Sequence, residues 1–295
     1  MRLIDWIVIT VLLAVVIGGT LDWGERPAEP PALVPDAVTR RPAPAMTAPM
    51  ADPARGESFA AQVPPPPPGR VRETLVIEAG DEPRRGGLFS GTAWALTGAK
   101  AWLSARHVTD RCRSLGFDDR RLAAAAGHPT ADVSAIPRSE AHTSGLVLSR
   151  DPLTVGEDVY LVGYPGGEPA AVHGTVVGAA KLDHRSVGVL EAVVVVNQRR
   201  RVPQIQGALG GISGGPVLDA DGHVVGSVIG GMERRARSII SIERNIAWLA
   251  AVAGDATSAS LATPEAARPL TPATFPRVAG DLLSSGQVRL VLCRT

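Results

Sequence analysis

Hydrophobic positions in the middle of the chain come in short runs that clusters of Gly, Pro and Asp separate. Runs of this kind are typical of strands in a barrel or a sandwich. We therefore predict an all-β domain over residues 71–253. Its expected strands are residues 73–79, 91–96, 101–106, 145–149, 157–163, 173–180, 189–196, 223–231 and 237–242.

One helix is expected at the end of this domain, around Glu243 to Ala253, because Ile246, Leu249 and Ala250 recur there at helical spacing. The remaining residues, 254–295, begin in Ala, Ser, Thr and Pro and end in the apolar run QVRLVLCRT. We predict that they form a C-terminal extension that packs on the domain and adds one more strand.

An uncharged apolar stretch runs from Trp6 to Leu21. As a helix it would be about 24 Å long, between the core of a signal peptide and a bilayer span of about 30 Å. No A-x-A cleavage site follows it, which favours an N-terminal membrane anchor over residues 1–21 and leaves a cleaved signal segment as the alternative. Arg2 before the stretch and acidic residues after it favour export of the rest of the chain.

Prolines gather in residues 22–70: thirteen of the 25 in the chain lie between Pro27 and Pro68. Proline cannot donate to a helix or a sheet, and this segment has few large apolar side chains to bury. We predict a disordered Pro-rich linker that tethers the domain.

Composition excludes several classes of function. Charged residues make up 20% of the chain and the net charge is +1, which argues against a strongly basic nucleic-acid binder. The two cysteines form no C-x-x-C pair, and no phosphate-binding G-x-x-x-x-G-K-[ST] motif occurs. We expect no metal, no cofactor and no nucleic-acid partner.

Candidate chemistry begins with the segment GGISGGPVL, residues 210–218. A nucleophilic serine needs a tight turn that exposes its oxygen, and backbone N–H groups that hold the developing oxyanion. Glycines on both sides of Ser213 allow such a turn. The alternative is a glycine-rich hairpin turn with an incidental serine.

Two further residues suit general-base chemistry. His107 lies near the end of the run WLSARHV, residues 102–108, where a strand is expected to meet a loop, and this position suits a base held by a rigid scaffold. Asp132 opens the alternating run ADVSAI and could accept a hydrogen bond from an imidazole. Asp110, Asp118 and Asp119 are rival carboxylates in the same region. The other histidines lack a comparable setting: His128, His142, His173, His184 and His223.

Taken together, GTAWAL…WLSARHV, ADVSAI and GGISGGPVLD resemble the trypsin-like (chymotrypsin-fold) serine peptidases, and most closely the bacterial Deg-type branch. Unlike members of that branch with a PDZ domain, this chain is expected to carry none. The segments LTVGEDVYLVGYPGG, residues 153–167, and DADGHVVG, residues 219–226, strengthen the likeness. It covers about residues 72–250, and the order His, Asp, Ser differs from subtilisin and α/β-hydrolase arrangements.

This resemblance implies a double six-stranded β-barrel with a catalytic triad in the cleft between the barrels. Ser213 would be the nucleophile, His107 the general base and acid, and Asp132 the orienting carboxylate. The N–H groups of Gly211 and Ser213 would form the oxyanion hole. The remaining implied site residues are Gly207 at the specificity pocket and Val228, Ile229 and Gly230 along the substrate strand.

Gly207 places no acid at the pocket, which argues for small or aliphatic residues before the cut bond rather than Arg or Lys. If the domain is exported, Cys112 and Cys293 can form a disulfide. Closing so long a loop would stabilise the fold by about 2–4 kcal/mol.

We therefore predict a hydrolase, a serine endopeptidase that cuts proteins or peptides through an acyl-enzyme. A single-pass inner-membrane segment would place it in the periplasm; secretion after signal cleavage is the alternative. Two other functions stay open. One is a catalytically silent trypsin-like fold that binds peptides or proteins, and the other is an exported structural or adhesive β domain.

Overall fold

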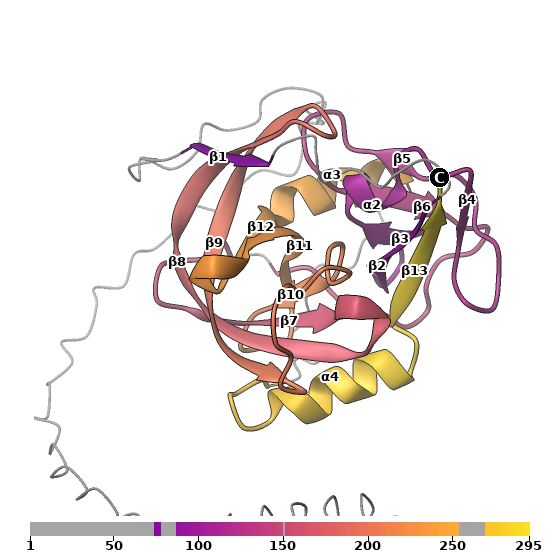
Figure 1. Cartoon of the computed structure of the whole chain (residues 1–295). Coiled ribbons are helices and arrows are strands. Elements are labelled where there is room, and N and C mark those ends of the chain that lie inside the picture. Colours follow the sequence, from indigo (N-terminus) through magenta and orange to yellow (C-terminus); the bar gives the residue numbers. More distant parts are fainter. Residues whose placement is uncertain (1–73, 78–86, 150, 254–268) are drawn as a thin grey trace, which may run out of the picture. The chain divides into compact units, whose positions relative to one another are not determined.

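The structure is a computed structural model that describes residues 74–77, 87–149, 151–253 and 269–295 (Figure 1). These residues form two sheets, and the all-β prediction for this part of the chain is confirmed. The predicted anchor, residues 1–21, and linker, residues 22–70, lie outside the described residues. Within the described part, no helix is both long and apolar enough to cross a bilayer.

One sheet closes into a six-stranded barrel. Its strands follow the order β8-β7-β10-β11-β12-β9, and pairing of β8 with β9 closes the ring. A further strand, β1, pairs in parallel with the end of β8. The bounds are β1 Thr74–Ile77, β7 Asp158–Gly163, β8 Ala170–His184, β9 Val189–Val202, β10 Pro216–Leu218, β11 Val224–Met232 and β12 Arg237–Ile242.

The other sheet has six strands in the order β4-β13-β2-β3-β6-β5 and stays open, because its two edge strands do not pair in the described residues. The expectation of two six-stranded barrels is therefore half right. The edge strands, of three and two residues, are too short to supply the ladder that closure needs. The bounds are β2 Leu88–Ala95, β3 Ala101–Ser104, β4 Ser114–Gly116, β5 Ala126–Gly127, β6 Ser134–Pro137 and β13 Val288–Arg294.

Strand β13 comes from the end of the chain and lies between β2 and β4 (Figure 1). The apolar run at the C-terminus is thus an internal strand of the open sheet. A disulfide joins Cys293 of this strand to Cys112, with their Cα atoms 5.4 Å apart. The predicted disulfide is present.

Helix α3 spans Glu243–Ala253, as predicted, and buries Ile246, Leu249 and Ala250. Helix α4, Phe275–Ser284, was not predicted; it packs against β7 and β8 of the closed barrel (Figure 1). The short helices are α2 Arg106–Thr109, η2 Pro165–Gly167 and η3 Glu233–Arg235.

The predicted strand over residues 145–149 is wrong. Two of its residues make isolated bridges instead: Leu146 pairs with Leu96 of the open-sheet side, and Leu148 pairs with Val224 of β11. Both leucines are buried. This apolar run therefore connects the two halves of the domain, which satisfies its burial without a strand ladder.

Candidate active site

Sheet pairing brings His107 and Asp132 together. Strand β3 pairs with β6 so that Ser104 faces Ser134, and the chain then leaves β3 into the single turn of α2 that holds His107. Asp132 lies two residues before β6 begins. The strand prediction through residue 106 was too long, because the backbone turns into α2 after Ser104.

Asp132 accepts two hydrogen bonds from His107. Oδ2 of the carboxylate lies 2.6 Å from Nδ1 of the imidazole, and Oδ1 accepts the backbone N–H of His107 at 2.8 Å. The Asp132 side chain is fully buried, whereas 26% of the His107 side chain is exposed. The ring is thus held at Nδ1, and its other edge is open to the solvent side.

The rival carboxylates bind arginines instead. Asp110 pairs with Arg106 at 2.9 Å, while Asp118 and Asp119 each lie 2.9 Å from the Arg289 guanidinium. None of the three forms a hydrogen bond with His107 in the described structure. Asp132 is therefore the carboxylate that orients this imidazole.

The glycine-rich segment is seated on strand β2, beside β3. The carbonyl of Ser213 accepts the N–H of Thr92 at 2.8 Å. Gly214 has a φ of 88°, and a Cβ there would lie 2.2 Å from the Thr92 carbonyl oxygen and 2.7 Å from the backbone nitrogen of Ala105. Only glycine permits this approach, which brings the backbone of Ser213 and Gly214 against the chain two residues before His107.

Gly211 meets the same requirement on the other side of Ser213. Its φ is 98°, and a Cβ would lie 2.5 Å from the carbonyl oxygen of Tyr164. Its own carbonyl accepts the hydroxyl of Thr92 at 2.8 Å, and that hydroxyl also accepts the N–H of Tyr164. Thr92 is a positioning residue that the sequence reasoning missed.

The N–H groups of Gly211 and Ser213 make no hydrogen bond within the described residues, although the neighbouring Ile212 N–H is bonded to Leu209. Two unpaired donors beside a serine can bind a developing oxyanion. This is the arrangement that the resemblance implies for Gly211 and Ser213.

Strand β11 carries the three residues expected to pair with substrate, and they differ in what they offer. Val228 uses both backbone groups within the domain, since its carbonyl accepts from Gly214 and its N–H donates to Gly215. Ile229 and Gly230 follow at a bulge, beyond the end of the β10 pairing. Only these two offer an edge for a substrate strand, so the expectation for Val228 needs correction.

Gly207 lies at an open hollow of about 740 Å³, lined by the end of β9, the loop that follows it, and Glu233 with Ala236. Its carbonyl accepts from the Arg201 guanidinium at 2.7 Å. A Cβ at Gly207 would lie 3.4 Å from a carboxylate oxygen of Glu233. Charges of both signs therefore stand beside a position that has no side chain.

A second histidine, missed at the sequence level, contacts the same carboxylate. Nδ1 of His184 lies 2.8 Å from Oδ2 of Asp132, and 4% of its side chain is exposed. The backbone N–H of Asp132 donates to Oε1 of Glu191 at 2.7 Å. No local signal could have identified either residue, because both reach Asp132 from the β8–β9 hairpin.

The ionisation of the site follows from these contacts. Burial disfavours charge on Asp132, but the nearby His107 charge and the hydrogen bonds from both imidazoles lower the pKa of Asp132 to about 2. Burial also disfavours charge on His107, yet the Asp132 carboxylate outweighs it and raises the pKa of His107. Burial raises the pKa of Glu191 to about 7, against the hydrogen bond from Ser241.

Within the described part of the chain, two groups of side chains offer atoms of the kind that bind metals. Those of His107, Asp132 and His184 lie within 4.8 Å of one another, but here both Nδ1 atoms face one carboxylate oxygen as hydrogen-bond donors. The second group is Asp219, Asp221 and His223. There the Asp219 carboxylate accepts the backbone N–H groups of the other two and caps a hairpin turn.

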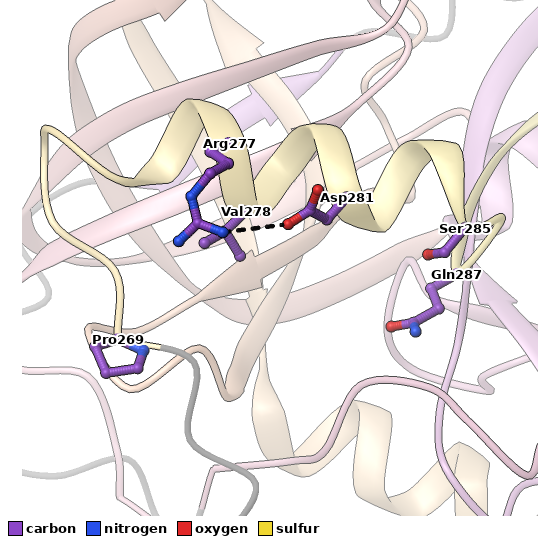
Figure 2. Close-up of a pocket in the computed structure, with 6 residues that line it drawn as sticks. All are labelled: Pro269, Arg277, Val278, Asp281, Ser285 and Gln287. Atoms are coloured by element: carbon purple, nitrogen blue, oxygen red, sulfur yellow. Dashed lines mark ion pairs between the residues drawn. The ribbon is translucent and has the colours of Figure 1, made fainter.

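Figure 2 shows a different hollow, of about 400 Å³, beside helix α4. It is lined by Pro269, Arg277, Val278, Asp281, Ser285 and Gln287. An ion pair of 3.6 Å joins Arg277 to Asp281, and the Ser285 hydroxyl donates to a backbone carbonyl. None of the expected site residues lines this hollow, and no histidine is among its lining residues.

Residues 89–226 match the family model of the trypsin-like peptidase domain, a range that contains His107, Asp132 and Ser213. A search of curated proteins finds no match.

Several solved structures are similar to this chain. The active form of the Rv3671c protease from M. tuberculosis is 18% identical, with a TM-score of 0.45 over 69% of this chain and 98% of that one. Its inactive form is 21% identical, with a TM-score of 0.44 over 57% and 88%. The HtrA-type protease AlgW with a decapeptide is 18% identical, with a TM-score of 0.43 over 54% and 50%.

Proposed function

We propose that this chain, a serine endopeptidase with a trypsin-like peptidase domain, hydrolyses peptide bonds through Ser213, His107 and Asp132. The observation that carries the proposal is the fully buried Asp132 carboxylate at 2.6 Å from Nδ1 of His107. It leaves Nε2 of His107 as the nitrogen that can accept a proton from a nucleophile.

In this mechanism the Ser213 hydroxyl attacks the peptide carbonyl while Nε2 of His107 takes its proton. The N–H groups of Gly211 and Ser213 bind the oxyanion. In other enzymes that form such an oxyanion, removing one donor of this kind lowers kcat by about 10²–10³-fold. His107 then gives the proton to the leaving amine, and water hydrolyses the acyl-enzyme by the reverse proton path. Asp132 stays ionised and stabilises the imidazolium.

The substrate is a protein or peptide that pairs as a strand with Ile229 and Gly230, at the edge that β10 leaves open. The residue before the cut bond enters the hollow at Gly207. Since Arg201 and Glu233 bring opposite charges to that position, neither sign is favoured. We expect a preference for small or aliphatic residues, which a peptide-library digest would measure.

We further propose that residues 1–21 anchor the enzyme in the inner membrane, with the linker holding the peptidase domain in the periplasm. The support is the uncharged stretch from Trp6 to Leu21 and the disulfide between Cys112 and Cys293, since disulfides persist in oxidising compartments. Cell fractionation and N-terminal sequencing test it. A mature chain that begins after residue 21 would show secretion instead.

The triad is tested with a fluorophosphonate probe on the full chain and on Ser213→Ala, His107→Ala and Asp132→Ala. We expect labelling of the parent, none of Ser213→Ala, and labelling weakened by about 10³-fold or more in the other two. Ser285→Ala, at the hollow of Figure 2, is the matched control and should label fully.

A folded parent that binds peptides but resists the probe would contradict the proposal and indicate a silent binding module. Full labelling of Asp132→Ala would contradict only the role of that carboxylate.

A further inference from the structure

The carboxylate that orients His107 is shared by a second imidazole. Oδ2 of Asp132 lies 2.6 Å from Nδ1 of His107 and 2.8 Å from Nδ1 of His184. The two rings are 5.3 Å apart between centroids and tilted by 58°. Because an ionised carboxylate only accepts hydrogen bonds, both Nδ1 atoms must carry the hydrogen in this arrangement.

His184 is held firmly by its backbone. It is the last residue of β8, paired with Val189 of β9 on one side and with Ile77 of β1 on the other. Its carbonyl accepts the N–H groups of Val187 and Gly188 in the turn that follows. The closed barrel thus places this ring, although its acceptor belongs to the open sheet.

The same hairpin holds Asp132 a second time. Oε1 of Glu191, on β9, accepts the backbone N–H of Asp132 at 2.7 Å. Oε2 of Glu191 in turn accepts from Ser241 at 2.7 Å and from Asn245 at 3.1 Å. Both the backbone and the side chain of Asp132 are therefore fixed by residues of the other half of the domain.

We propose that His184 is a positioning residue: its Nδ1–H donates to Oδ2 of Asp132 and keeps that oxygen aligned with Nδ1 of His107. The inference rests on the proposed function of His107 and Asp132. It assigns a role that acts only through Asp132, since His184 itself is buried and faces the carboxylate.

Two consequences follow for the reaction. Without the second donor the Asp132 carboxylate can rotate, and misalignment of this partner lowers kcat rather than weakening substrate binding. The charge on Oδ2 would also act more fully on His107 and raise its pKa. Two other charged groups face this pair: Asp110, whose charge raises the pKa of His107, and Glu191, whose own pKa is raised by burial and by the charge of Asp132. Both remain in the variants below.

The test compares two substitutions of nearly equal shape in the full-length protein. In His184→Asn the side-chain amide N–H can occupy the place of Nδ1–H, and in His184→Leu no donor remains. We expect His184→Leu to lower kcat by about 10–100-fold, the range seen when residues that orient metal-ligating side chains are replaced, with KM little changed. The acidic limb of kcat/KM should move up by about half a pH unit, and His184→Asn should recover most of both effects.

Equal loss in the two variants, or no change in kcat and the pH profile of His184→Leu, would overturn the proposal. A measurement on the parent needs no variant. Selective ¹⁵N-histidine NMR should show His184 with its hydrogen on Nδ1, and a bare Nδ1 would overturn the proposal even if the variants fail to fold.

NMR titration of His107 in the Ser213→Ala background separates this inference from the proposed function, because it does not depend on activity. A raised His107 pKa in His184→Leu that returns in His184→Asn supports the role of His184. Failure of the parent to react with the fluorophosphonate probe would instead count against the proposed function.

Discussion

The two halves of the domain reach stability by different routes. In the closed barrel all six strands come from one continuous stretch, from β7 to β12, and the long β8–β9 hairpin closes the ring. The open sheet takes its second strand, β13, from the far end of the chain and has short edges. His107 and Asp132 belong to the open half, so the proposed base depends on the last residues of the chain.

The halves also support each other in opposite directions. The loop of Ser213, from the closed barrel, is seated on β2 of the open sheet. Asp132, from the open sheet, is held by His184 and Glu191 of the closed barrel. A site built from two halves of a domain needs them in a fixed relation, and these reciprocal hydrogen bonds provide it.

The largest expected effect would test whether the open sheet needs β13. Val291 of β13 is fully buried, and Val291→Asp places an unpaired carboxylate in the core. We expect a loss of more than about 4 kcal/mol in the free energy of unfolding, together with loss of probe labelling. The matched control is Val177→Asp on β8, where the side chain is 40% exposed and little change is expected. Similar melting temperatures for the two variants would refute the comparison.

Next in size is the contact that seats the nucleophile loop on the open sheet. Gly214→Ala needs a positive φ and a Cβ 2.2 Å from the Thr92 carbonyl oxygen, so the loop must move. We expect the free energy of unfolding to fall by about 3 kcal/mol and kcat/KM to fall at least about 10²-fold. Gly210→Ala, with no atom within 4 Å of its Cβ, should behave like the parent. Unchanged kcat/KM in Gly214→Ala would be inconsistent with this seating.

The next prediction concerns how much the disulfide between Cys112 and Cys293 stabilises the open sheet, which contains strand β13. Replacing Cys112 and Cys293 by serine should lower the free energy of unfolding by about 2–4 kcal/mol, because the bond closes a loop with a sequence separation of 181 residues. Thermal melts with and without reductant measure this, with thiol titration as the control. A parent insensitive to reductant, with two titratable thiols, would show that the bond does not form.

The smallest expected effect comes from Glu191, the residue of the closed barrel that accepts the backbone N–H of Asp132. The pKa of Glu191 is raised to about 7 from its ordinary 4.5 by burial. The stability that its neutral form contributes is present below pH 4.5 and is lost as the pH rises through 7. Between pH 4.5 and 7, the free energy of unfolding of the parent should fall by up to about 3 kcal/mol more than that of Glu191→Gln, which has no carboxyl group to ionise. Parallel curves of melting temperature against pH for the two proteins would contradict this.

Local pattern was sufficient for much of the fold. Apolar runs between turn residues predicted most strands of the closed barrel, and helical spacing predicted α3 at its observed bounds. Helix α4 was missed because its apolar face begins at Phe275 directly after a Pro- and Thr-rich stretch. Strands β4, β5 and β10 were missed because two or three residues are too few to show a period.

In the candidate site, too, some residues could be predicted from local sequence and others only from the packing of the domain. Ser213 was predicted from the glycines around it, since a tight turn is a local property of the backbone. His107 and Asp132 were predicted from their positions at strand ends, and the β3–β6 register then joined them. The backbone groups of Val228 were misjudged, because their use by Gly214 and Gly215 depends on how the loop docks.

By itself the sequence determined the all-β character of the domain, the turn around Ser213 and the residue types of a serine peptidase site. Tertiary structure alone decided which barrel closes, where β13 inserts, and that His184 meets Asp132 across 52 residues of chain. The reason is physical. Turns and periodicity are set by neighbours in the chain, whereas backbone pairing is nearly indifferent to side-chain identity, and its partners are chosen by the packing of the whole domain.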